Sequence, residues 1–279
     1  MTNTALLHRT PLREVTADDV ATYERDGVVL LPGVFGATWL DLLRAGVDRC
    51  MSTPGPHAVF GDRSQPGFFF GDQDMWLRLP AFRRLVHESP AALIAARIMR
   101  ASRINFFFDQ VIVKEPGTEQ RTPWHQDQPY WAVSGHQVCA IWLALDDVAR
   151  ENCVEFVLGS HRWGTEFNPQ HFADGSGYAG TGLPPLPDIE AQREQYPIGS
   201  FSVQAGDCIV FNAMTVHGAP GNRSLARRRR AVSTRWCGDD ARYRVRAGEV
   251  AVPSCDPGLQ DGDILDCEIF PRVWQHEPA

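Results

Sequence analysis

The stretch TPWHQDQPYW, residues 122–131, places His125 and Asp127 two positions apart. Alternate residues of a β-strand point to the same face, so a strand here would direct an imidazole and a carboxylate the same way. Such a pair supplies two ligands of a metal site, and a second histidine completes a facial arrangement of two histidines and one carboxylate. His217, in the later segment VFNAMTVHGAP, is the candidate for the third ligand.

The spacing alone is a weak signal, because His-x-Asp also describes a half-buried strand histidine beside a hydrogen-bonded acid. The context favours a site. The pair follows an apolar run at 104–113 and a turn-rich loop at 115–122, and it precedes the run VCAIWLAL at 138–145. A lone histidine at a strand end is more often an edge residue, but coupled to the His-x-Asp pair His217 predicts a site at the mouth of a β-rich core.

Composition limits the classes of protein to which the chain can belong. With 279 residues and 43% hydrophobic content it can bury a large core as one domain. It has no apolar run long enough for a membrane span, and its N-terminus lacks the apolar segment of a secretory signal. Seven scattered cysteines without a Cys-x-x-Cys pair favour reduced thiols in the cytoplasm. The net charge of −7 argues against a nucleic-acid surface, so we predict a cytoplasmic enzyme with a small-molecule substrate.

The order of elements predicts helices first and a β core second. Thr16 with Asp19 indicates a capped helix that ends at Gly27, and Thr38 with Asp41 repeats the signature. Further helices are expected at 80–86 and 90–101, where prolines lie near the first turns. From residue 104 short apolar runs alternate with turns, including 201–204, 207–211 and 229–236, which is typical of an antiparallel sandwich or barrel.

We expect one domain over residues 1–279. It comprises a helical part at about 1–103, a β core at about 104–237 and a tail at 238–279. Residues 160–200 form a long polar insertion rich in glycine and proline. Loops of this length are usually functional lids or disordered segments.

Six arginines crowd residues 223–235, RSLARRRRAVSTR. A strand here would turn Arg229, Ala231 and Ser233 to one face and Arg228, Arg230 and Val232 to the other. An inward arginine is costly to bury unless it meets an anion, and a ligand carboxylate held by the guanidinium would meet that need. Arg229 is the first choice and Arg228 the alternative, because the sequence does not set the register of the strand.

Together these pieces resemble the phytanoyl-CoA dioxygenase family of Fe(II)/2-oxoglutarate-dependent oxygenases. The similarity covers most of the chain: DGVVLLPGVF near the N-terminus, DQVIVKEPGT, TPWHQDQPYW, VCAIWLALDDVARENCVEFVLGSHRWG, and the region from His217 to Arg229. The combination is much more specific than the His-x-Asp pair by itself.

The resemblance implies a mainly β, cupin-like fold: a double-stranded β-helix, or jelly roll, with the N-terminal helices packed outside it. It implies Fe(II) bound by His125, Asp127 and His217, with 2-oxoglutarate and O2 as cosubstrates. Arg229 would bind the C5 carboxylate of 2-oxoglutarate, Trp142 would lie beside that cosubstrate, and Gln110 would also touch it. His161 matches a family feature but is interpreted as structural.

Two departures from the family pattern concern the cosubstrate. Some relatives use an upstream lysine on 2-oxoglutarate, whereas Lys114, the only lysine, lies too late in the chain for that role. Some relatives also carry a serine two residues after the distal histidine, where this chain has Ala219.

The implied reaction is hydroxylation of an unactivated C–H bond with release of succinate and CO2. The carboxylate at Asp127 argues against halogenation, while desaturation, epimerisation and ring expansion remain open. Several aromatic residues are candidates for an apolar substrate pocket, Tyr130 and Trp131 above the others, which are Phe68, Phe69, Phe70, Trp76 and Trp163. A small or medium-sized, partly apolar metabolite is expected. The alternatives are a zinc-dependent cupin-like hydrolase or isomerase and a non-catalytic β-sandwich binding protein.

Overall fold

Four α-helices lie before residue 103, with three strands between them, in a computed structural model that describes residues 7–61, 67–172 and 175–276. They are α1 (Ala17–Asp26), α2 (Ala37–Ser52), α3 (Pro80–Glu88) and α4 (Ala91–Met99). The predicted cap of α1 is confirmed. Thr16 Oγ1 accepts a hydrogen bond from the Asp19 backbone N–H, and the Asp19 carboxylate accepts one from the Thr16 N–H. Gly27 ends the helix with φ of +75°, a conformation that favours glycine.

The cap predicted for the second helix is wrong. Helix α2 begins one residue earlier than Thr38, after Gly36, and Gly36 has no side chain to cap it. Thr38 and Asp41 therefore lie inside the first turns of the helix. The spacing of a capping box also occurs by chance within helices, and only the backbone conformation distinguishes the two cases.

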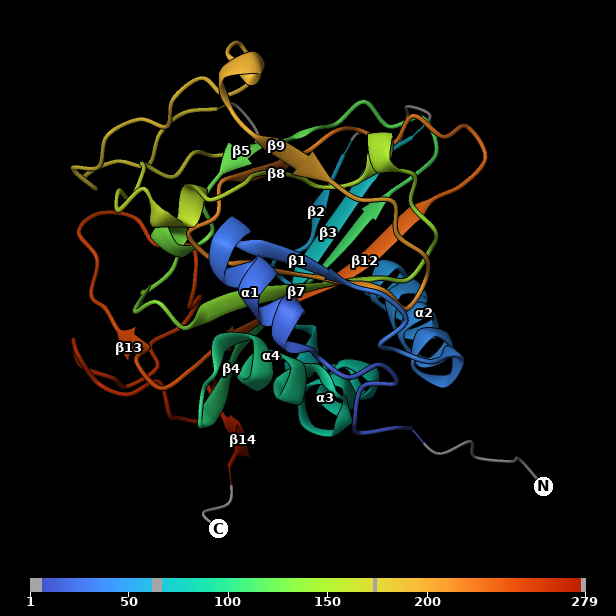
Figure 1. Cartoon of the computed structure of the whole chain (residues 1–279), viewed down its shortest axis with the longest axis horizontal. Coiled ribbons are helices and arrows are strands. Elements are labelled where there is room, and N and C mark those ends of the chain that lie inside the picture. Colours follow the sequence, from blue (N-terminus) through green and yellow to red (C-terminus); the bar gives the residue numbers. More distant parts are fainter. Residues whose placement is uncertain (1–6, 62–66, 173–174, 277–279) are drawn as a thin grey trace.

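A large sheet, whose strands differ in length, forms one wall of the β core (Figure 1). Its strands run in the order β1-β10-β7-β12-β4-β3-β2, and β14 also pairs with β4. The bounds are β1 (Val28–Leu31), β2 (Val59–Phe60), β3 (Phe69–Gln73), β4 (Arg103–Lys114), β7 (Val138–Ala144), β10 (Cys208–Asn212), β12 (Arg229–Cys237) and β14 (Arg272–Gln275). All the pairings are antiparallel, as the alternating apolar runs predicted.

A smaller sheet carries the site residues. It has the order β5-β11-β8-β9, with β5 (Thr122–His125), β8 (Glu155–Val157), β9 (Ile198–Ser200) and β11 (His217–Ala219). A two-stranded ribbon joins β6 (Val133–Ser134) to β13 (Arg242–Tyr243). Five 3₁₀ turns interrupt the described loops: η1 (Met75–Leu77), η2 (Gln128–Tyr130), η3 (Arg150–Asn152), η4 (Ser160–Arg162) and η5 (Arg193–Gln195).

The large sheet separates two apolar cores, and β7 contributes to both. Its Ile141 and Leu143 pack with the helices, whereas Ala140, Trp142 and Ala144 lie in the core that also contains Phe156 of the small sheet. Successive side chains of a strand point to opposite faces, so the continuous apolar run of β7 serves both layers. The helices α3 and α4 lie below the large sheet in Figure 1, and β5, β8 and β9 lie above it. The predicted jelly roll with outer helices is confirmed.

Two details of the predicted β core change. Residues 201–204 do not form a strand, because the hydrogen-bonded strand lies just before them at β9 and only Val203 forms an isolated bridge, to Val148. The tail, which was hard to assign from sequence, contributes β14 to the edge of β4. Among the described residues no helix has the length and hydropathy needed to cross a bilayer. All seven cysteines are free thiols, five of them buried.

Candidate active site

The three predicted metal ligands converge. His125 ends β5, His217 begins β11, and the two are direct partners in the antiparallel register of the small sheet. Their ring centroids are 4.2 Å apart. One ligand atom from each histidine and one from Asp127 all lie within 4.8 Å of one another, and all three residues are buried. A separation of 92 residues in sequence is thus closed by a single cross-strand pair.

The reason given for the orientation of Asp127 is wrong, although its position near His125 is as predicted. Strand β5 ends at His125, and Asp127 has φ of −74° and ψ of −46° at the start of η2. The backbone N–H groups of Asp127 and Gln128 both donate to the carbonyl of Ala213, at 2.9 and 3.0 Å. The turn before β11 therefore holds the carboxylate in place, and the alternation of a strand does not.

Hydrogen bonds to the backbone set the tautomers of both histidines. His125 Nδ1 donates to the carbonyl of Pro123 at 2.8 Å, and His217 Nδ1 donates to that of Thr215 at 2.9 Å. A carbonyl can only accept, so in the neutral form of each imidazole the proton is on Nδ1 and the lone pair is on Nε2. These atoms face Asp127 Oδ1 at 3.3 and 3.9 Å. Backbone partners of this kind orient metal-binding histidines.

Electrostatics holds His217 and Asp127 in the protonation states that a metal requires. Burial and the neighbouring His125 lower the pKa of His217 to about 3, so its imidazole is neutral at pH 7. Burial alone would raise the pKa of Asp127, but Arg235 and the two histidines hold it well below its usual range. Three lone-pair donors that face one another repel, and a cation between them removes that repulsion.

The register of β12 places the predicted cosubstrate residues on the inner face of the large sheet. Ser233 pairs with Trp142 on one side and with Gln110 on the other, so these three residues form one row across β7, β12 and β4. Arg229 lies at the start of β12 and is 3% exposed. Arg228 points outward, where it forms ion pairs with Glu115 and Asp48. The alternation predicted for this strand is confirmed, and Arg229 is the inward arginine.

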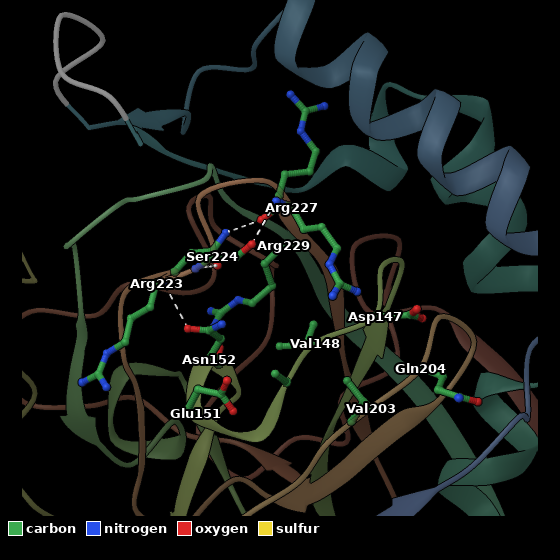
Figure 2. Close-up of a pocket in the computed structure, with 13 residues that line it drawn as sticks. Asp147, Val148, Glu151, Asn152, Val203, Gln204, Arg223, Ser224, Arg227 and Arg229 are labelled. Carbon is green, nitrogen blue, oxygen red and sulfur yellow. Dashed lines mark hydrogen bonds between the residues drawn. The ribbon is translucent and has the colours of Figure 1, made fainter.

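Arg229 is a buried cation without an acidic partner among the described residues. Its Nη1 donates to the carbonyl of Asn152, and its Nε has no hydrogen-bond partner. Burial lowers its pKa to about 10, so it stays charged at neutral pH. Figure 2 shows Arg229 directed toward Asn152 at the edge of a cavity of about 460 Å³, which Val148 and Val203 also line.

The sequence profile described as phytanoyl-CoA dioxygenase matches residues 23–231. The chain belongs to the phytanoyl-CoA dioxygenase family. An ectoine dioxygenase of Bordetella bronchiseptica is 25% identical over 222 residues, which cover 75% of this chain and 71% of the relative.

Solved structures agree with this family. The non-haem α-ketoglutarate-dependent carbocyclase SnoK superimposes with a TM-score of 0.74 at 24% identity, over 95% of this chain and 99% of SnoK. The epimerase SnoN, in complex with Fe³⁺, α-ketoglutarate and nogalamycin RO, gives 0.69 at 26% identity, over 92% and 98%. Iron, 2-oxoglutarate (α-ketoglutarate) and O2 are thus the metal and cosubstrates of the family.

The residues of this member fit that metal. Two neutral imidazoles and one carboxylate are the ligand set of non-haem Fe(II) oxygenases, which keep the other positions open. Asp127 Oδ2 is buried and has no hydrogen-bond partner, and the Nδ1–H bonds of both histidines leave Nε2 directed toward Asp127 Oδ1. Both observations are explained by a cation that the three ligand atoms share.

Two residues near the phytanoyl-CoA dioxygenase site were missed or misplaced by sequence reasoning. Lys114, expected to lie too late in the chain to act on 2-oxoglutarate, is the register partner of Arg229 across β4 and β12. Its Nζ donates to the carbonyls of Gln120 and Pro220, and burial lowers its pKa to about 6. Arg235 was not considered, although the alternation that turns Arg229 and Ser233 inward continues to it. It lies 3.8 Å from Asp127.

The insertion at 160–200 covers the triad from outside. Phe172 packs edge-on against the His125 ring, with centroids 4.9 Å apart. The Tyr130 hydroxyl donates to the carbonyl of Gln170 at 2.9 Å. The Gln126 side chain, between the two ligands of the motif, donates to the carbonyl of Thr165 at 3.1 Å. The described part of the insertion is therefore attached to the metal-binding loop.

The aromatic candidates divide between the site and the helix-side core. Tyr130 contacts His125 edge-on at 5.8 Å, and Trp131 packs against Phe108 at 5.3 Å. Phe70 and Trp76 are instead buried between the large sheet and the helices, so they line no pocket at the triad. Among the others, Phe68 packs partly buried against the helix-side core, Phe69 pairs with Lys114, and Trp163 packs on Phe167 and Tyr196. His161 donates to the carbonyl of Glu24, as expected of a structural residue.

Proposed function

We propose that this protein is an Fe(II)/2-oxoglutarate-dependent hydroxylase of a small or medium-sized, partly apolar metabolite. The observation that carries the proposal is the convergence of His125, Asp127 and His217 at the small sheet, in a fold whose large sheet bears the buried Arg229. When bound, iron and 2-oxoglutarate supply the oxidation of an unactivated C–H bond by O2, with release of succinate and CO2.

In this proposal the two histidines and Asp127 hold the metal at the mouth of the barrel. Arg229 binds the C5 carboxylate of 2-oxoglutarate from the inner face, which supplies the anion that its burial requires. Lys114 lies beside it as its register partner, with Nζ hydrogen-bonded to the carbonyls of Gln120 and Pro220. Trp142 packs against the cosubstrate, and Gln110 is placed in the same row. The rings of Phe172 and Tyr130 exclude water above His125.

A second outcome deserves the same test, because the fold is shared with a carbocyclase and an epimerase. Both hydroxylation and epimerisation begin with removal of hydrogen from the substrate, but only hydroxylation leaves an oxygen atom from O2 in the product. We also propose a cytoplasmic location, which the seven free cysteines support.

The first experiment is an anaerobic absorption titration of the Fe(II)-loaded protein with 2-oxoglutarate. We expect a weak visible charge-transfer band from chelation of the iron by 2-oxoglutarate. A folded, iron-containing protein that gives no band overturns the proposal and favours the zinc-enzyme or binding-protein alternatives. Once a substrate is found, turnover under ¹⁸O2 decides the reaction. Label in the product derived from the substrate means hydroxylation. An unlabelled product of the substrate, with succinate formed, means epimerisation, desaturation or ring closure.

A further inference from the structure

Arg235 is a buried cation at the triad that the proposed reaction does not use. Its side chain is 6% exposed and leaves β12 on the same face as Arg229. Nη2 donates to Gln110 Oε1 at 3.1 Å and lies 3.8 Å from Asp127 Oδ2. Nη1 donates to the carbonyl of Ser233 at 3.0 Å, and Nε has no hydrogen-bond partner. The guanidinium therefore retains donor capacity beside the metal position.

The surroundings of Arg235 are aromatic. Its guanidinium carbon lies 4.4 Å from the centroid of the Phe108 ring and 5.7 Å from that of Trp131. Stacking on rings orients an arginine and leaves its edges available for hydrogen bonds. A molecule bound at this edge would meet apolar rings on one side and the metal on the other.

The charges near the metal leave Arg235 without a counter-ion. Among the described residues, the carboxylate within ion-pair distance of Arg235 is that of Asp127. A bound metal would neutralise the negative charge of this carboxylate. Asp109 also acts on Arg235, but burial raises the pKa of Asp109 to about 8, so it is largely neutral at pH 7. A bare guanidinium in such a place costs several kcal/mol unless an anion joins it.

A charge count for the loaded site gives the same result. The metal ion brings two positive charges, and Arg229 and Arg235 bring one each. Asp127 brings one negative charge and 2-oxoglutarate brings two. One positive charge is left over, and protonation of Lys114 would only increase the excess. In a buried site such an excess favours binding of an anion.

We propose that Arg235 recognises a carboxylate of the substrate, with Gln110 as the positioning residue that orients the guanidinium. The substrate is then an organic acid whose apolar part lies against Phe108 and Trp131. Nε and Nη2 form the edge of a guanidinium that binds carboxylates through two hydrogen bonds. This inference rests on the proposed function and deepens it by naming the substrate class.

The competing explanation is that Arg235 only restrains Asp127. Its Nη2 is 3.8 Å from Asp127 Oδ2, which is beyond hydrogen-bond distance, and restraint leaves Nε unsatisfied. The two explanations predict different losses. A restraint on Asp127 affects the affinity for the metal, whereas a carboxylate site affects discrimination between an acid and its neutral analogue.

The test is anaerobic calorimetry on the protein loaded with Fe(II) and 2-oxoglutarate. The probes are phenylacetate with phenylacetamide, and hexanoate with hexanamide. The wild type should bind each acid at least about tenfold more tightly than its amide, since hydrogen bonds to charged groups contribute about 1.5–3 kcal/mol. Arg235→Gln should abolish this preference, and Arg235→Lys should retain part of it because the charge remains. Arg49→Gln, an exposed arginine of α2, should behave as wild type.

Four results would overturn the inference. The wild type could bind acids no more tightly than amides, or Arg235→Gln could keep the preference while losing Fe(II) affinity, which would establish the restraint on Asp127. An acid that abolishes the 2-oxoglutarate band has displaced the cosubstrate, and this also counts against a substrate site. If Arg235→Gln does not fold, Arg235→Lys decides: full wild-type discrimination would exclude recognition by the guanidinium fork. A missing band in the wild type is a failure of the proposed function instead.

Discussion

Arg229 and Arg228 are neighbours in sequence with opposite surroundings. The first is 3% exposed at the inner face, and the second forms outer ion pairs with Glu115 and Asp48. We expect Arg229→Gln to weaken 2-oxoglutarate binding about 10- to 100-fold, because one or two charge-assisted hydrogen bonds are lost. Arg228→Gln should change it less than about twofold. Anaerobic titration of the charge-transfer band measures both, and equal losses would mean that the cosubstrate does not reach the inner face.

Asp109 makes a second prediction at the scale of one residue. It lies on the helix side of β4, where one carboxylate oxygen accepts from the Trp76 N–H at 3.0 Å and the other has no partner. Burial raises its pKa to about 8 from 3.8. The folded protein therefore holds a proton that the unfolded chain releases above about pH 4, so this group lowers stability as the pH rises from about 4 to about 8.

Asp109→Asn removes that ionisation while keeping an oxygen for the Trp76 N–H. We expect the free energy of unfolding to increase by a few kcal/mol at pH 8, because the unfolded wild type is favoured by releasing this proton and the variant has none to release, with little gain at pH 4. Urea unfolding at the two pH values measures the difference. A gain of the same size at both pH values would show that ionisation of Asp109 is not the cause.

At the scale of elements, the pairing of β5 with β11 links the metal to the small sheet. His125 and His217 face each other across this pair, which has a register shift between His217 and Ala219. A metal bound by both should stabilise the pair, by about 2.7 kcal/mol when free metal is 100 times its dissociation constant. Thermal unfolding with Ni(II) as a redox-stable substitute should show the increase, and His217→Ala should remove it. An undiminished increase in the variant would place the metal elsewhere.

The elements show what the sequence could and could not predict. The helices α1, α3 and α4 and the strands β4, β7, β10 and β12 were expected near their observed positions, because each has its own periodicity or caps. The strand expected at 201–204 and the strand alternation expected to orient Asp127 were wrong. Both depend on hydrogen bonds to distant segments: β9 pairs with β8, and Asp127 bonds to Ala213. The local sequence pattern does not indicate such partners.

The site residues follow the same division. The triad was predicted because histidine and aspartate are recognised as metal ligands from their residue types. The choice of Arg229 over Arg228 needed the register of β12. The proximity of Lys114 to Arg229 needed the pairing of β4 with β12. Register is a property of two strands together, so a single strand cannot reveal it. Arg235 could have been found by extending the alternation two more residues.

At the scale of the whole molecule, the tail, the insertion and the metal loop meet at Arg246. Its side chain is 6% exposed, pairs with Glu166 of the insertion at 2.9 Å, and donates to the carbonyls of Gln128 and Val133 just beyond Asp127. Arg244 also pairs with Glu166 but is 43% exposed. This junction, together with β14, supports the proposal that residues 1–279 fold as one domain.

We expect Arg246→Met to lower the free energy of unfolding by about 3 kcal/mol, because it leaves Glu166 and the carbonyls of Gln128, Trp131 and Val133 without their buried partner. Arg244→Met, at a solvent-exposed pair, should cost less than about 1 kcal/mol. Denaturant unfolding compares the two variants, and metal affinity should fall only in the first. Equal costs would mean that the junction does not join the tail to the metal loop.

The position of the two histidines on facing strands has a consequence in the cell. Without the ion, three lone-pair donors repel one another at the junction of β5, β11 and the Asp127 loop, and this part of the barrel opens more often. Proteases cleave opened chains faster than closed ones, and a 1–2 kcal/mol change in stability is enough to alter protein abundance several-fold. Iron supply would thereby determine how long each copy of the protein survives, as well as whether it can turn over.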